Sequence, residues 1–319
     1  MSPSIKHHEV RWRGMLHDES ELIAEDLSES DALRRRPLLI ALIAFCSVGF
    51  LAADVATPVF FEDAFPAMLS LGVVTAQLTV ISVWGTLVHG AFWVRLPWTL
   101  LMLTISWCAL GFGNTIDHGH FYPSSMLALG IVWTLGFITS FVPLKIAAVA
   151  FGWKIIANSD SLVDGKRKSQ TAVRDILTGT LLLALTMAIV RGPFVGERVD
   201  FQQAWDTSRM ARVQNAVALL IFGVVSLIVK LPCIWIGLGV SRSQILRMTL
   251  VWVFLCFLLS VLEVVVFVSA FGAPGTDELE AYTAIILSHQ IMGGIVLGIC
   301  LALRGLGYRL ERSRTPPVE

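Results

Sequence analysis

Charge is scarce in this chain of 319 residues. Charged residues make up 15% of the sequence, whereas soluble domains hold about a quarter, and the mean hydropathy is +0.72. The 24 basic and 24 acidic residues cancel, so no global field favours nucleic acid or a strongly charged ligand. This composition excludes an ordinary soluble domain and indicates residence in a membrane.

Familiar catalytic motifs are also absent. The sequence contains no HExxH, no GxSxG and no GxxxxGK followed by Ser or Thr. Those spacings place zinc ligands, a nucleophilic serine or a phosphate-binding loop. Metalloprotease, serine hydrolase and nucleotidase functions therefore lose their usual support, and we lean towards a protein that is not an enzyme. No cofactor is firmly implied.

Cysteine is infrequent, and no secretory leader is visible. All five cysteines fall within apolar runs or at their ends, where packing is a more common role than disulfide formation: Cys46, Cys108, Cys233, Cys256 and Cys300. The first 36 residues are polar and acidic rather than a short basic stretch followed by an apolar core. We expect no cleavable signal peptide, so the first span serves as its own insertion signal.

What the sequence has in abundance is long apolar runs. A helix needs about 20 apolar residues to cross the hydrocarbon layer, where its own hydrogen bonds satisfy the backbone. We therefore predict an all-α, polytopic membrane bundle of about eight spans in one domain, residues 37–305. Residues 1–36 are expected to be a mobile polar tail and residues 306–319 a short one. The predicted spans are 37–55, 67–89, 96–112, 125–146, 172–191, 213–236, 245–270 and 281–303.

The distribution of Lys and Arg predicts the orientation of these spans. Eight spans put both termini on one face, and basic residues are retained on the cytoplasmic side. Of the 24 basic residues, four fall on the opposite face, in one loop. The remaining twenty lie on the face that holds the termini, so we predict that both termini are cytoplasmic. The plasma (inner) membrane is the expected location.

Glu263 is the carboxylate that the sequence places deep within a span. It precedes the predicted outer boundary at Ala270 by seven residues, which corresponds to a depth of about 10 Å. His289 reaches a similar depth on the next, antiparallel span, so the two side chains are predicted to meet, with Ser288 and Gln290 alongside. A buried ionisable pair can be a proton or ion relay, a ligand contact, or a hydrogen bond that fixes helix register.

Two further features lie within the predicted spans. Gln77, near the middle of the second span, is predicted to form an interhelical hydrogen bond. Gly294 and Gly298 have the small-xxx-small spacing that lets helices approach closely. That spacing predicts either packing against a neighbour in the bundle or association of two copies through this face.

The outer loop after the third span contains a cluster of metal-ligand types. Asp117, His118 and His120 lie within four residues, and carboxylate and imidazole suit zinc or a similar divalent ion. A site needs a further ligand, and only distant residues such as Glu62 or Asp63 share that face. The alternative is an ordinary solvated loop.

Three functions follow as hypotheses. The first is a non-enzymatic scaffold, assembly factor or partner subunit, because polar groups within the spans are few. The second is a small-solute or proton-coupled transporter centred on Glu263, His289 and Gln77, with Gln290 as a further binding residue. The third is a membrane-embedded metal-dependent enzyme that acts on lipid through the outer-loop ligands. Expected partners are membrane lipids, a membrane protein or a second copy, and no nucleic acid.

Overall fold

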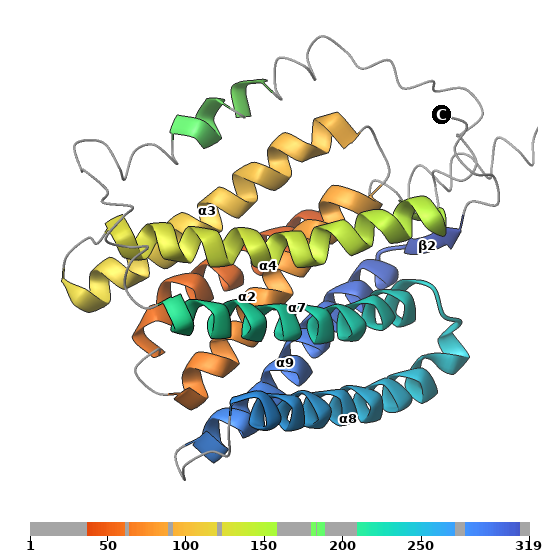
Figure 1. The fold of residues 1–319 in the computed structure, drawn as a ribbon. Helices are drawn as coiled ribbons and strands as arrows, with labels where there is room; N and C mark the ends of the chain where they lie inside the picture. The colour runs from red at the N-terminus through yellow and green to blue at the C-terminus, as the bar shows by residue number, and fades with distance from the viewer. Residues whose placement is uncertain are drawn as a thin grey trace, which may run out of the picture.

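The structure, a computed structural model, describes residues 37–60, 64–88, 92–119, 123–157, 180–182, 184–188, 209–271 and 278–312. It is an all-α polytopic membrane bundle (Figure 1). Within these residues, six helices are long and apolar enough to cross a membrane. A seventh long helix contains a shorter apolar stretch, Val224–Leu238.

The helices correspond to the predicted spans. The first helix, Pro37–Ala56, continues into the 3-10 helix η1 (Thr57–Phe60). The other long helices are α2 (Ala64–Leu87), α3 (Phe92–His118), α4 (Pro123–Ala150), α7 (Arg209–Leu238), α8 (Ile245–Phe271) and α9 (Glu278–Gly305), with η4 (Arg242–Gln244) before α8. Seven predicted spans are thereby confirmed as helices. The fifth, 172–191, lies mostly outside the described residues, and its described parts are helical.

Helix α2 is the centre of the bundle. It packs against α9, α4 and α3, and it contributes to both hydrophobic clusters. Its residues Ala76 and Val83 belong to a cluster with α7, α8 and α9, whereas Val74 and Leu78 belong to one with α3 and α4. At Gly72 the backbones of α2 and α9 are so close that an added Cβ would lie 2.6 Å from a carbonyl oxygen of α9. The residues on α9 are therefore positioned mainly by α2.

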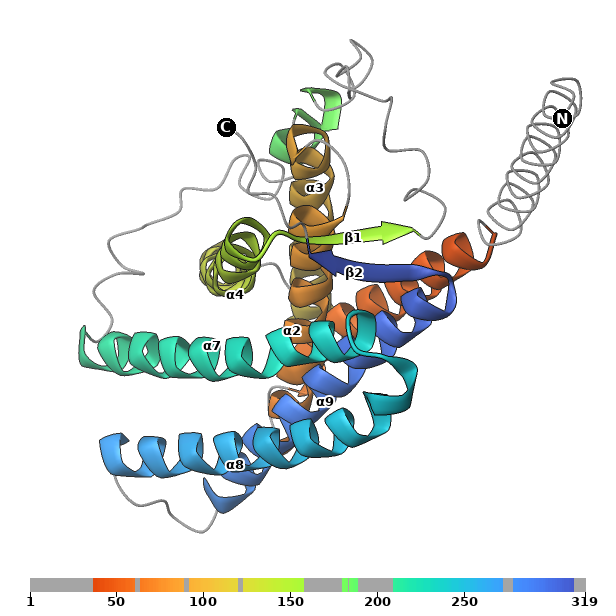
Figure 2. The same cartoon turned by 90° about the vertical axis from the view of Figure 1, so that its right-hand side faces the viewer.

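A two-stranded ribbon joins two distant helix ends. Strand β1 (Trp153–Ala157) follows α4, strand β2 (Tyr308–Arg312) follows α9, and they pair antiparallel (Figure 2). Each strand follows a glycine with positive φ, Gly152 at 63° and Gly307 at 91°. Glycine adopts this conformation without steric cost and often ends a helix. Strand β2 lies within residues 306–319, which the sequence predicts to be a short tail.

The ends of four helices gather at this ribbon. Val88, directly after α2, forms a β-bridge with Ile155 of β1. Arg304, in the last turn of α9, donates hydrogen bonds to the carbonyl oxygens of Gly237 and Val240 at the end of α7. Helices α2, α4, α7 and α9 therefore end on the same side of the molecule, as even-numbered spans of an eight-span bundle should.

Prolines inside α4 and α7 do not end these helices. Helix α4 runs past Pro143 to Ala150, and α7 runs past Pro232 to Leu238. Proline removes a backbone hydrogen bond from the preceding turn, so each helix has a weakened turn within the bundle.

Candidate functional site

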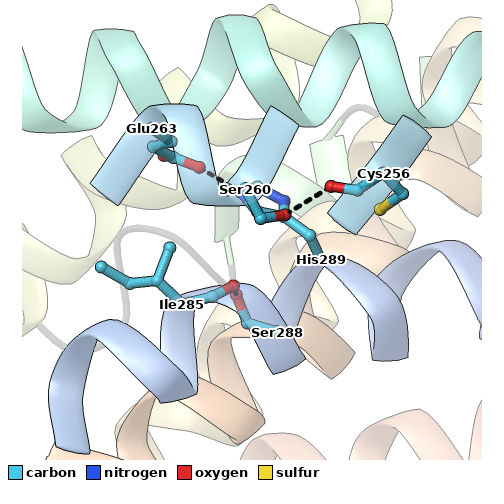
Figure 3. Close-up of polar contacts among 6 residues, drawn as sticks. All are labelled: Cys256, Ser260, Glu263, Ile285, Ser288 and His289. Carbon is cyan, nitrogen blue, oxygen red and sulfur yellow. Dashed lines mark hydrogen bonds and ion pairs between the residues drawn. The ribbon is translucent and has the colours of Figure 1, made fainter. Parts of the chain in front are cut away.

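Glu263 and His289 contact each other between α8 and α9. The Nε2 atom of His289 lies 2.6 Å from Oε2 of Glu263. The exposed fractions of the two residues are 1% and 0%. Figure 3 shows Glu263 on α8 directed towards the imidazole that rises from α9. The contact predicted from equal depth on antiparallel spans is confirmed.

The two serines beside this pair form hydrogen bonds within their own helices. Ser260, one turn before Glu263, donates a hydrogen bond to the carbonyl of Cys256, at 2.8 Å (Figure 3). Ser288 donates to the carbonyl of Ile285, also at 2.8 Å. Both hydroxyls are thus satisfied within their own helices, which is a common solution for serine in apolar surroundings. Neither competes for the carboxylate.

The chemistry of the pair depends on where its proton resides. With an ionised carboxylate, the imidazole donates through Nε2, and with a protonated carboxyl, the imidazole nitrogen accepts. Oε1 of Glu263 is buried and has no hydrogen-bond partner among the described residues. The contact of 2.6 Å is compatible with a proton on either side chain.

Gln77 forms the predicted interhelical bonds, but with partners that the sequence did not indicate. Its Nε2 donates to Oδ2 of Asp54 at 2.9 Å and to Oγ of Ser106 at 2.8 Å. Ser106 in turn donates to the same Asp54 oxygen at 2.7 Å. Gln77 thus joins the first helix, α2 and α3 in a buried cluster with Asp54 at its centre. It has no hydrogen bond to Glu263 or His289 among those described.

A third buried contact joins α4 and α7. The Nζ atom of Lys230 donates to Oγ of Ser140 at 2.7 Å, and both residues are buried. Ser140 donates to the carbonyl of Gly136 at 3.2 Å. The contact lies just before Pro143 in α4 and just before Pro232 in α7. Lys230 lies six residues before the end of the predicted span 213–236, and lysine near a span end normally extends towards water.

The remaining predicted binding and packing residues are placed differently. Gln290 is half-buried beside His289. Gly294 and Gly298 are exposed, and a Cβ at either would meet no described atom within 4 Å. Close packing within the bundle occurs instead at Gly293, where a Cβ would collide with the ring of Trp252. Packing of the other two glycines against a neighbour in the bundle and association of two copies through them both stay predictions.

The predicted metal ligands are only partly described. Helix α3 extends through Asp117 to His118, so these two residues belong to its last turn rather than to an extended loop. His120 lies outside the described residues. Within the part of the chain that the structure describes, no three His, Cys, Asp or Glu side chains are grouped as for a metal ion. The metal site stays a prediction.

Hydroxyl groups are frequent in the interior. Along α2, Thr75, Thr79, Ser82 and Thr86 are buried, and each donates to the carbonyl four residues earlier. Together with the three contacts above, they make the interior considerably more polar than apolar runs alone suggest. The premise that polar groups within the spans are few does not hold.

No family model, curated protein or solved structure matches this chain.

Proposed function

We propose that this protein is a proton-coupled membrane transporter in which Glu263 and His289 bind and release the proton. The observation that carries the proposal is the buried contact of 2.6 Å between these side chains, on adjacent helices of a membrane bundle. Ionisable residues are costly inside a membrane, and those that occur there mark ion pathways and proton relays.

Coupling follows from the charge of the pair. Glu263 and His289 are neutral together when they hold one acidic proton, and they carry a charge when they gain or lose one. In a low-dielectric interior an uncompensated charge destabilises the protein strongly. Release or uptake of a proton is therefore favoured when a charged solute arrives or leaves at the same time. Gln290, half-buried on the same helix, is the proposed contact for that solute.

Access to the pair requires a second conformation. Both side chains are covered in the structure described here. Helix α8 is the element suited to move, because it packs loosely against the rest of the bundle. Of its apolar stretch 22% is buried, compared with 67% for α2. The prolines inside α3, α4 and α7 supply weakened turns of the kind found in transporter helices. We propose that α8 moves away from α9 to open a path to the pair.

Proton movement in liposomes tests the proposal. Purified protein is reconstituted with the pH dye pyranine inside, and a potassium gradient with valinomycin sets the membrane potential. The internal pH is recorded without solute and then with pools of small anionic, cationic and neutral metabolites. We expect proton movement with the wild type under at least one condition and its loss in Glu263→Gln.

The matched control is Ser269→Ala on the same helix. Ser269 is exposed and donates a hydrogen bond to the backbone of its own helix, at 2.7 Å, so its removal should leave proton movement unchanged. Equal proton movement in wild type and Glu263→Gln, or none in the wild type with every pool, contradicts the proposal.

A role as partner subunit is the second candidate, supported by the first helix. Only 6% of the apolar stretch in the helix Pro37–Ala56 is buried within the bundle, although Asp54 at the end of this helix is fully buried. A helix with so little intramolecular packing presents nearly its whole circumference to lipid or to another protein. Purification in a gentle detergent tests this candidate. A stoichiometric partner that is lost after Phe45→Ala supports it, and a clean monomer contradicts it.

A further inference from the structure

Asp54 is a fully buried carboxylate at the end of the helix Pro37–Ala56. We propose that Asp54, Gln77 and Ser106 form a binding site for one monovalent metal cation of the sodium type. This site is separate from the Glu263–His289 pair, and the proposal does not depend on proton transport.

Three helices build the site around one carboxylate. Oδ2 of Asp54 accepts hydrogen bonds from Nε2 of Gln77 at 2.9 Å and from Oγ of Ser106 at 2.7 Å. Gln77 also donates to Ser106 at 2.8 Å. The three side chains are 0%, 5% and 1% exposed. Water therefore does not reach them in this conformation, and their relative positions are fixed by mutual hydrogen bonds.

Two oxygen atoms of this cluster are left without a partner. Oδ1 of Asp54 and Oε1 of Gln77 are buried and accept no hydrogen bond from any described residue. Both are acceptors only, and they belong to groups already in contact with each other. A buried acceptor without a donor destabilises a protein by about 1–3 kcal/mol. A cation bound by both oxygens would satisfy both at once.

The electrostatics of the site also call for positive charge. The carboxylate lies in the last turn of a helix, where the unpaired carbonyls carry partial negative charge. The α-helix gives way to η1 directly after Ala56. Among the described residues no Lys, Arg or His pairs with Asp54. A carboxylate in this position is unfavourable without a counter-ion.

The charge balance and the ligand chemistry select the type of cation. Carboxylate, amide and hydroxyl oxygens are hard ligands that suit metal ions without preference for nitrogen or sulfur. One carboxylate neutralises one positive charge, so a divalent ion would leave a buried excess charge. Transporters also use the carbonyl ends of helices to coordinate sodium ions. A proton on Oδ1 that is donated to Oε1 of Gln77 would balance the charge as well, and the titration with metal ions distinguishes the two.

Thermal unfolding in detergent tests this site. The purified full-length protein is titrated with NaCl, LiCl or KCl, with choline chloride keeping the ionic strength constant. We expect the unfolding temperature of the wild type to rise with one of the metal ions and to saturate. Asp54→Asn keeps the acceptor for Gln77 and Ser106 but removes the charge, and it should lose this dependence.

Two further variants separate the alternatives. Ser106→Ala should raise the midpoint cation concentration by about tenfold, as expected for loss of about 1.4 kcal/mol, and it tests the site if Asp54→Asn does not fold. Glu263→Gln, which changes the other buried carboxylate, should keep the full cation dependence even where proton movement is lost. A wild type that responds equally to choline and metal ions overturns the proposal, as does an unchanged response in both Asp54→Asn and Ser106→Ala.

Discussion

The buried ammonium group of Lys230 has a single described hydrogen-bond partner, Ser140. A lysine ammonium has three donors and is strongly hydrated in water. Burial in a membrane bundle removes that hydration, so the contact with Ser140 offsets only part of the loss. At the scale of single residues, stability should therefore depend on which partner is removed.

Removal of the serine should destabilise the protein, whereas removal of the charge should not. Ser140→Ala leaves the lysine without this bond, and we expect the free energy of unfolding to fall by about 1–3 kcal/mol. Lys230→Met keeps the volume without a buried charge, and stability should stay the same or rise. Equilibrium unfolding in mixed detergent measures the free energy of unfolding of both variants. A larger loss for Lys230→Met than for Ser140→Ala would contradict this reading.

The Glu263–His289 contact should be visible as a coupling energy. Glu263→Ala leaves the imidazole without this partner, and we expect a loss of about 1 kcal/mol, while His289→Ala costs a similar amount. The double variant should cost less than the sum, because one interaction is removed in each case. Gln290→Ala serves as the control on α9, with little effect. Strict additivity of Glu263→Ala and His289→Ala would show that the pair contributes no stability.

The sequence predicts some of these residues and misses others, for a physical reason. Equal depth along two antiparallel helices is enough to bring Glu263 and His289 together. Asp54 lies at the end of its predicted span, where depth counting places it at water, and Lys230 lies six residues before the end of its predicted span, where depth alone indicates no partner. Helix packing, rather than distance along the helix, buries them: α2 and α3 cover Asp54, and α4 covers Lys230. One chain without its fold does not contain that information.

At the scale of elements, helix α9 packs closely against α8 at Gly293 but not at the adjacent Gly294. Gly293 faces the ring of Trp252, and that ring is held by a hydrogen bond of 3.1 Å from Nε1 to the carbonyl of Val229. The ring cannot move aside without losing this bond. Gly294 faces open space among the described residues.

Alanine at the two positions should therefore have opposite effects. We expect Gly293→Ala to lower the free energy of unfolding by about 1–3 kcal/mol through overpacking. Gly294→Ala should leave it unchanged or raise it by up to about 1 kcal/mol, because alanine favours the helix. Thermal unfolding of both variants decides the point. Equal effects would mean that α9 is not seated against α8 in this way.

Element boundaries show where sequence patterns stop being informative. Apolar runs locate the helices, but α3 continues six residues beyond its predicted end at 112, to His118. Helical hydrogen bonding does not end where the hydrocarbon does, so polar residues can prolong a span. The β1–β2 ribbon was not predicted at all. Two five-residue strands far apart in sequence carry too little local pattern for their pairing to be inferred.

At the scale of the whole molecule, Gly294 and Gly298 leave a smooth exposed strip on α9. Small residues at this spacing let two helices approach closely in lipid. We expect a dimer in gentle detergent that is weakened by Gly294→Leu combined with Gly298→Leu. The control, Leu262→Ala on the exposed face of α8, should leave the mass unchanged. Light scattering measures the mass of the protein in detergent, and a monomeric wild type would contradict the expectation.

The ribbon also predicts which residues share a membrane face. Lys154 of β1 and Ser243 of η4 are exposed at the side where four helices end. Glu278 begins α9 and lies at the other end of that helix. Cysteine introduced at Lys154 or Ser243 should react with an impermeant maleimide from one side of the membrane, and cysteine at Glu278 from the other. We expect the first side to be cytoplasmic, and labelling of all three from one side would contradict the topology.

The pairing of β1 with β2 constrains how many times the chain between them crosses the membrane. The chain leaves one membrane face at β1 and returns to that face at β2, so it must cross the membrane an even number of times between them. Helices α7, α8 and α9 provide three crossings, which puts Ala157 and Arg209 on opposite faces. We therefore expect the predicted span 172–191, most of which lies outside the described residues, to supply a fourth crossing, and deletion of that span should prevent the ribbon from forming.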